Sequence, residues 1–150
     1  MNLSMKKLVE SPEYFEDVFQ ALYSNWGNNN PNFWRGWIKS CMSSTDIPVT
    51  YIVFLDDKFV GTFSLWLCDL QSCQNLSPWL GGIVVQEEYR GQGIGLYIQK
   101  QAKKILRALD INRAFLFTDL IGFYEKTGWR FAGEAFDEND KKVRLYELIL

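Results

Sequence analysis

The spacing of apolar residues near the N-terminus predicts two amphipathic helices. Ser11-Pro12 places an N-cap residue before a proline, which is typical of a helix start. The segment 15–22 then carries apolar residues at i, i+3, i+4 and i+7. The run 27–31, rich in Asn and ending in Pro, breaks this helix. A second helix is predicted to carry its apolar face between Trp34 and Cys41.

Most of the remaining chain reads as strands. The β-branched and aromatic runs, together with period-two alternation, predict two hairpins and three further strands. The expected strands are 6–9, 50–55, 59–67, 79–85, 114–117, 129–136 and 143–150. Gly81-Gly82 lies inside the apolar run 79–85, where such a pair is costly unless a bulge or a close ligand requires it.

Two more helices complete the predicted order. Apolar residues recur at helical spacing between Gly93 and Leu109, and a shorter helix is expected from Asp119, as its cap, to Gly128. The order of elements is therefore βααβββαβαββ. This order, within 150 residues, predicts a single α/β domain over residues 1–150, with helices on both sides of one sheet.

Composition excludes several classes of function. A net charge of −2 gives no broad basic surface, so we expect no nucleic-acid partner. We interpret the basic residues Lys100, Lys103, Lys104 and Arg107 as a solvated helix face. The chain has no histidine and only three cysteines without metal-ligand spacing, which excludes a common zinc site and a histidine-activated nucleophile. No apolar stretch of 18 residues and no N-terminal apolar run occur, so we expect neither a membrane span nor a signal peptide. We expect a cytoplasmic location, where the cysteines are free thiols.

The most informative segment is the turn between strand 79–85 and the helix that follows it. Glycines at 91, 93 and 95 allow close approach of a ligand to the main chain. The first amides of the next helix have no intrahelical acceptor, so the junction suits a phosphate or diphosphate. The run lacks the Lys-Ser or Lys-Thr pair of a Walker A loop and departs from the G-x-G-x-x-G dinucleotide fingerprint. A purely structural turn is the alternative.

Two motifs carry a resemblance to a known family. The run Arg90-Gly91-Gln92-Gly93-Ile94-Gly95 resembles the R/Q-x-x-G-x-G/A loop of the GNAT superfamily of acyl-CoA N-acyltransferases. Phe123-Tyr124-Glu125-Lys126-Thr127-Gly128-Trp129 is similar to the F-Y-x-K-x-G-F/W motif of the same family. The resemblance implies a mixed, mostly antiparallel sheet of about seven strands flanked by four helices. It also implies acetyl-CoA as cofactor and a primary amine of a small molecule or peptide as acceptor.

The resemblance also assigns site residues. It implies that the main chain of Ile83, Val84 and Val85 contacts the pantetheine arm, and that a main-chain N–H there polarises the thioester oxygen. The loop residues Arg90, Gly91, Gln92, Gly93, Ile94 and Gly95 hold the diphosphate, and Phe123 packs against the cofactor or the core. Tyr124 matches the tyrosine that donates a proton to the CoA thiolate; a core tyrosine is the alternative.

The general base and the acceptor pocket stay open at this stage. A carboxylate acting directly or through water is the natural base in a chain without histidine. The candidates are Asp69, Glu87, Glu88 and Asp119, each of which also suits a surface charge or a cap. Asp119 stands where the family often has asparagine, which puts that cofactor contact in doubt. Trp26, Trp34, Trp37 and Trp66 line the acceptor pocket or pack in the core.

Three classes of function remain in competition. The leading hypothesis is an N-acetyltransferase that works by direct attack of the amine on acetyl-CoA. A non-catalytic acyl-CoA-binding sensor or assembly module is the second, and a structural protein without ligand is the third. Neither the acceptor, nor the length of the acyl group, nor the choice between monomer and homodimer follows from the sequence.

Overall fold

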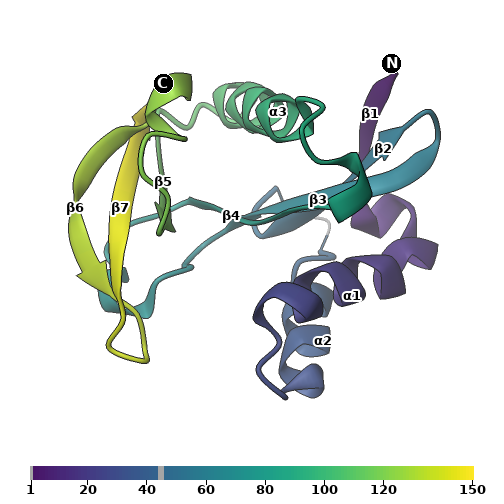
Figure 1. The fold of residues 1–150 in the computed structure, drawn as a ribbon, viewed down its shortest axis with the longest axis horizontal. Coiled ribbons are helices and arrows are strands. Elements are labelled where there is room, and N and C mark those ends of the chain that lie inside the picture. The colour runs from purple at the N-terminus through teal and green to yellow at the C-terminus, as the bar shows by residue number, and fades with distance from the viewer. Residues whose placement is uncertain (1, 44–45) are drawn as a thin grey trace.

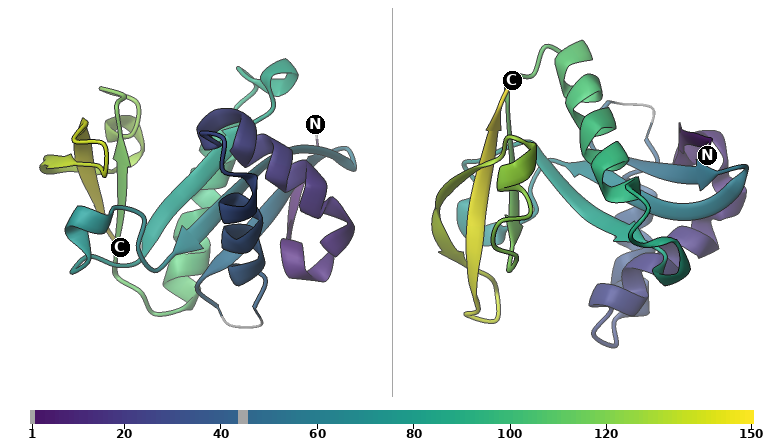
Figure 2. Two further views of the ribbon diagram at one scale, coloured as in Figure 1. Left: turned by 90° about the horizontal axis from the view of Figure 1, so that it is seen from below. Right: turned by 45° about the horizontal axis from the view of Figure 1, so that its top comes forward.

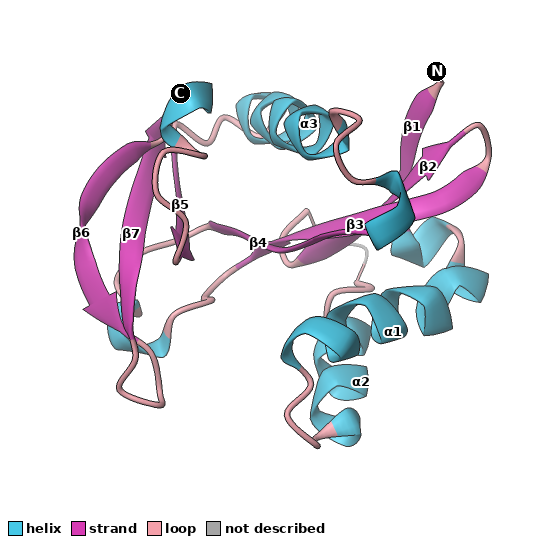
Figure 3. Cartoon of the chain, viewed as in Figure 1, coloured by secondary structure: helices cyan, strands magenta, loops and turns pink. Residues whose placement is uncertain are grey.

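A computed structural model describes residues 2–43 and 46–150. It contains three α-helices and seven strands among these residues (Figures 1 and 3). In chain order they are β1 (Leu3–Lys7), α1 (Phe15–Trp26), α2 (Pro31–Ser40), β2 (Val49–Leu55), β3 (Lys58–Trp66), β4 (Trp79–Val85), α3 (Ile94–Ala108), β5 (Arg113–Thr118), β6 (Arg130–Phe136) and β7 (Lys142–Ile149). Short 3-10 turns connect several of them, among them Gln71–Cys73, Glu87–Tyr89 and Glu125–Thr127.

The seven strands form one mixed sheet. Its order is β1-β2-β3-β4-β5-β7-β6. Every neighbouring pair is antiparallel except β4 and β5, which are parallel. The expected α/β class and the mostly antiparallel sheet of seven strands are therefore confirmed. The parallel pair in the middle is where the functional elements meet.

The helices cover the sheet from both sides. Helix α3 lies on one face, and α1 and α2 lie on the other (Figures 1 and 2). Ile94, Ile98 and Ala102 of α3 are buried against the inner strands. Val18 and Leu22 of α1 are buried in a separate cluster on the opposite face. The sheet thus separates two apolar layers, and side chains of β4 reach both.

Two elements differ from the prediction. The first strand covers Leu3–Lys7 instead of 6–9, because the chain turns into a 3-10 segment at Leu8. The helix expected from Asp119 to Gly128 is reduced to the turn Glu125–Thr127, because the segment before it is irregular and Gly122 has a φ of +84°. Asp119 caps no helix there. Gly128, with a φ of +94°, does end the turn, as predicted.

Cys41, Cys68 and Cys73 form no disulfide. Within residues 2–43 and 46–150, no group of three or more metal-ligating side chains comes together. No helix in the same part of the chain has the length and apolar character needed to cross a membrane.

Candidate active site

The site is built around the point where β4 and β5 separate. The two strands share a single pair, Trp79 with Phe115, beside a hydrogen bond from Phe115 N–H to Pro78 O of 3.0 Å. After that pair they diverge (Figure 1). Gln86 N–H donates to Val60 of β3 at 2.8 Å, and N–H groups alternate in direction along a strand, so Val85 N–H points away from β3. The second half of β4 therefore offers main-chain groups on its β5 side.

A bulge interrupts β4 at the same place. Gly82 has a φ of +59°, a conformation that strongly favours glycine. The register of β3 against β4 shifts between Thr62 and Ser64, opposite this residue. The glycine pair expected to mark a bulge or a close ligand does form a bulge.

The side chains that follow the bulge alternate between the two faces of the sheet. Ile83 and Val85 are partly buried against the layer under α3, and Tyr124 packs against that same layer. Val84 is buried in the opposite layer with α1. The predicted contacts of these three β4 residues involve main-chain atoms, so they do not require the side chains to share a face.

The glycine turn contains a row of N–H groups without a main-chain acceptor among the described residues. Gly91 and Gly93 have φ values of +78° and +83°, and a Cβ built on either would meet no atom within 4 Å. The first main-chain hydrogen bond of α3 is from Tyr97 N–H to Gly93 O, 3.0 Å long. Among the described residues, the N–H groups from Gly91 to Leu96 donate to no main-chain oxygen. Together with the dipole of a helix of 15 residues, these amides can bind an anion.

Two neighbours hold this turn in place. Ile94 is 1% exposed and anchors the first turn of α3 in the core. The Nε–H of Arg90 donates to Val85 O at 3.0 Å, which ties the turn to the end of β4. Gln92 is exposed and Gly95 is half-buried. The turn is fixed at its ends, while the N–H groups from Gly91 to Leu96 keep no main-chain acceptor among the described residues.

Tyr124 lies next to this turn. A Cβ on Gly95 would lie 3.9 Å from Cζ of Phe123, so the turn and the 123–124 segment are adjacent. The Tyr124 ring packs edge-on against Phe123, with 4.9 Å between centroids, and against Trp129 at 6.3 Å. Burial raises the pKa of the Tyr124 phenol, and no hydrogen bond to its hydroxyl is found among the described residues. The phenol is therefore protonated at neutral pH and available as a donor.

A polar network that the sequence analysis missed fixes the backbone of Tyr124. Gln99 of α3 is 2% exposed, and its Oε1 accepts a hydrogen bond from the Thr127 hydroxyl. Lys103 Nζ donates to Thr127 O, and burial lowers the pKa of this lysine. Thr127 N–H donates in turn to Tyr124 O at 3.0 Å. Lys103 is thus an anchor rather than part of a solvated face; the only signal in the sequence was a glutamine inside the apolar stripe of a helix.

The four candidate bases are in very different surroundings. Glu87 and Glu88 are exposed on a 3-10 turn. Asp119 accepts a hydrogen bond from Lys141 at 2.7 Å in an exposed ion pair. Asp69 is partly buried, and burial, followed by the negative charge of Glu138, raises its pKa from 3.8 to about 7. Its carboxylate lies against β4, since a Cβ on Gly81 would be 2.8 Å from Asp69 Oδ2.

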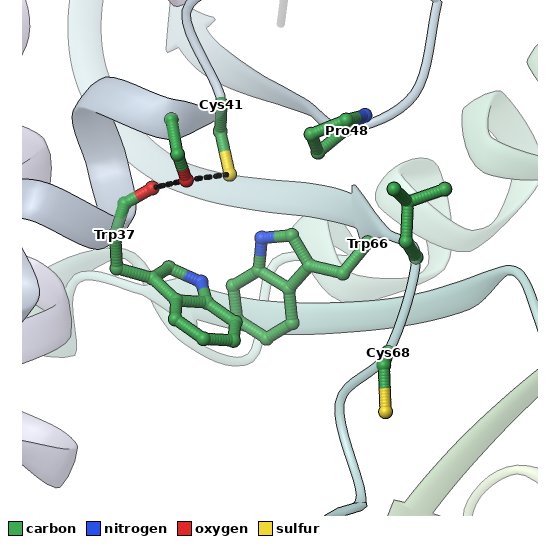
Figure 4. Close-up of a pocket in the computed structure, with 7 residues that line it drawn as sticks. Trp37, Cys41, Pro48, Trp66 and Cys68 are labelled. Carbon is green, nitrogen blue, oxygen red and sulfur yellow. Dashed lines mark hydrogen bonds between the residues drawn. The ribbon is translucent and has the colours of Figure 1, made fainter. Parts of the chain in front are cut away.

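The four tryptophans do not form one pocket. Trp26 is 48% exposed, while Trp34 donates its Nε1–H to Trp26 O at 3.2 Å. Trp37 and Trp66 meet edge-on with 5.3 Å between centroids (Figure 4). They line a cavity of about 160 Å³ together with Ser40, Cys41, Pro48, Leu67 and Cys68. Trp34 packs on Trp37 with 6.4 Å between centroids, so the structure brings three of the four rings into contact and places two of them at the cavity.

Comparison with known proteins assigns the family. A model of the acetyltransferase (GNAT) family matches residues 10–129. The chain belongs to the GNAT acetyltransferase family. The open turn and the Phe123-Tyr124 segment described above fall within the matched range.

Solved structures with the same fold include several GNAT enzymes. An aminoglycoside 6'-N-acetyltransferase complexed with coenzyme A aligns with a TM-score of 0.78 and 16% identity, covering 99% of this chain and 97% of that one. A GNAT family acetyltransferase from Elizabethkingia anophelis with acetyl-CoA bound gives a TM-score of 0.68 at 14% identity and covers 99% of both chains. A variant spermidine N-acetyltransferase from Vibrio cholerae aligns with a TM-score of 0.74 and 12% identity, covering 98% of this chain and 93% of that one. At these identities the likeness shows the fold shared with this GNAT chain, not its substrate.

Proposed function

We propose that this GNAT protein is an N-acetyltransferase that transfers the acetyl group of acetyl-CoA to a primary amine, with Tyr124 as general acid. The observation that carries the proposal is the row of N–H groups between Gly91 and Leu96 that have no main-chain acceptor, next to a protonated phenol without a hydrogen-bond partner among the described residues. Family membership supplies the acetyl-transfer chemistry.

The residues present suit the diphosphate of coenzyme A. A diphosphate needs several donors that converge on one point, together with a positive field. The left-handed Gly91 and Gly93 leave open space beside the main chain, where a ligand can approach, and the N-terminus of α3 adds its dipole. On its β5 side Val85 offers its main-chain N–H to an extended amide chain such as pantetheine, while its carbonyl accepts from Arg90. When bound, acetyl-CoA supplies an activated acyl group as a thioester.

The residues then act on the amine and on the leaving group. Holding both reactants at the β4 bulge makes attack effectively unimolecular. As the N–C bond forms and the C–S bond breaks, the sulfur leaves as a thiolate, whose reference pKa is about 8.5. The Tyr124 phenol, with its pKa raised by burial, keeps its proton until the thiolate develops and then donates it.

The acceptor is proposed as a primary amine of a small molecule or peptide. Two of the structural neighbours are named for spermidine and for aminoglycosides, which are amines that carry positive charge at neutral pH. The formal charge of −2 on this chain is compatible with such cations. Cytoplasmic location and a monomeric or homodimeric state remain predictions.

Thiol release from acetyl-CoA over a panel of amines tests the proposal. Wild type should turn over at least one amine, and Tyr124→Phe should lower kcat by about 100-fold while the Kd for CoA stays within twofold. Tyr14→Phe is the matched control, because Tyr14 packs against Phe54 and Phe59 on the other side of the sheet. An unchanged kcat in Tyr124→Phe would remove the acid role.

The same preparation separates the competing functions. CoA at 100 times its dissociation constant should raise the free energy of unfolding by about 2.7 kcal/mol. Tight CoA binding without turnover of any amine would favour a binding module instead. No shift in thermal unfolding with CoA would favour a protein without this ligand.

A further inference from the structure

The two glycines of the β4 bulge are covered by one indole and one carboxylate. A Cβ on Gly81 would lie 2.5 Å from Cζ3 of Trp66 and 2.8 Å from Oδ2 of Asp69. A Cβ on Gly82 would lie 3.0 Å from Cη2 of the same indole. Any side chain at 81 would therefore displace the ring or the carboxylate. The absence of side chains on β4 lets Asp69 reach the main chain of the bulge.

This carboxylate lies on the face opposite to the phenol. Trp66 belongs to the buried cluster that includes Cys41 of the α2 end, with Trp37 packed against it. Tyr124 packs against the layer under α3. The pairing of β4 with β5 ends at Trp79, two residues before Gly81. Asp69 and Tyr124 therefore flank the split between β4 and β5 from its two faces.

Asp69 has no partner of its own among the described residues. Within residues 2–43 and 46–150, Asp69 forms no ion pair and no side-chain hydrogen bond, although it is partly buried. The one charged group found to act on it is Glu138 in the β6–β7 turn, and that charge is negative. The Ser72 hydroxyl donates to Phe136 O at 2.7 Å and ties the loop after Asp69 to this hairpin. A lone, shielded carboxylate next to an indole face favours a cation as its missing partner.

We propose that Asp69 binds the substrate ammonium and takes its proton, presenting a neutral amine at the Gly81-Gly82 bulge beside Trp66. This inference deepens the proposed function and rests on it. One proton passes from the ammonium to Asp69 and then to water. As the N–C bond forms and the C–S bond breaks, the nitrogen releases a second proton to water, Tyr124 gives its proton to the sulfur, and the phenolate regains a proton from water.

The surroundings of Asp69 suit this task. Because burial and Glu138 raise its pKa to about 7, the carboxylate holds a proton more strongly than an exposed aspartate and releases it to water near neutral pH. The base works in its ionised form. The value of kcat/KM should therefore fall as the pH drops through about 7.

The test compares wild type with Asp69→Asn by thiol release from acetyl-CoA. The amines are spermidine, an aminoglycoside, a peptide with a free N-terminus, and the pair ethylamine and 2,2,2-trifluoroethylamine. Asn should lower kcat/KM at least about 100-fold on amines that are ammonium ions at neutral pH. The loss should be much smaller for the fluorinated amine, which is already neutral, if ethylamine is a substrate. The Kd for CoA should not change.

A second variant and a control test whether the acid limb of the kcat/KM profile reports the titration of Asp69. Glu138→Gln removes the neighbouring charge, so the acid limb of the kcat/KM profile should move to lower pH while the maximum stays the same. Glu134→Gln, on the exposed face of the same hairpin, should leave the profile unchanged. If Asp69→Asn keeps both the rate and the acid limb of wild type, the inference is wrong although the acetyltransferase stands. If wild type acetylates no amine, both fall.

Discussion

The strongest prediction concerns the stability of the Asp69→Asn variant as a function of pH. In the folded protein the pKa of this carboxyl is about 7, against an ordinary value of 3.8 in an unfolded chain. Between these values the folded state binds more protons than the unfolded state, so its free energy of unfolding falls as the pH rises. An ion-paired aspartate with a lowered pKa has the opposite effect, because it makes the free energy of unfolding rise with pH. Asn cannot ionise, so the Asp69→Asn variant does not lose this part of its free energy of unfolding as the pH rises.

The size of the effect follows from the same difference. Each pKa unit corresponds to about 1.4 kcal/mol, so the full loss between acidic pH and pH above 7 has an upper limit of about 4 kcal/mol. Urea unfolding of wild type and Asp69→Asn from pH 4 to pH 8.5 measures it. The difference between the two free energies should grow in favour of Asn by more than 1 kcal/mol per pH unit near pH 6. Parallel curves would refute the idea that burial perturbs Asp69.

Three other substitutions follow from the geometry. Gly93→Ala should weaken CoA binding at least about tenfold, measured by calorimetry, and lower the free energy of unfolding by about 1–3 kcal/mol, measured in urea, because Gly93 has a positive φ. The control Gly36→Ala lies in a helix with open space around it and should change neither quantity. An unchanged CoA affinity in Gly93→Ala would contradict the anion site. Gly81→Ala should abolish turnover but leave CoA binding, because its Cβ overlaps the indole and the carboxylate; normal kcat would contradict that packing. Gln99→Leu should lower kcat several-fold and the free energy of unfolding by about 1–3 kcal/mol, since Thr127 loses its buried partner; an unchanged protein would show that the contact is unimportant.

The elements that the sequence predicted well are those specified by neighbouring residues. Strand β4 has the expected bounds, and α3 begins and ends within a residue of the prediction. Alternation, helical spacing and glycine positions encode these features locally. The segment from Asp119 to Gly128 was different, because a helix pattern of only ten residues yielded to two left-handed glycines and to an ion pair with Lys141.

The contacts that organise the candidate site could not be predicted from the sequence, because they join residues that are distant along the chain. Asp69 meets Gly81 only after β3 and β4 pair and their loop folds back. Gln99 meets Thr127 across 28 positions of the chain. Residue type gave four equivalent carboxylates as candidate bases; burial and the neighbouring Glu138 are what distinguish one of them.

The split between β4 and β5 also bears on the order in which substrates bind. In the proposed function, CoA binds on the face that carries Tyr124 and the amine binds on the face that carries Trp66 and Asp69, so neither has to leave before the other arrives. Initial-rate plots at several fixed concentrations of the second substrate should therefore intersect, as for a ternary complex, and should not run parallel as for a ping-pong exchange through an acetylated side chain.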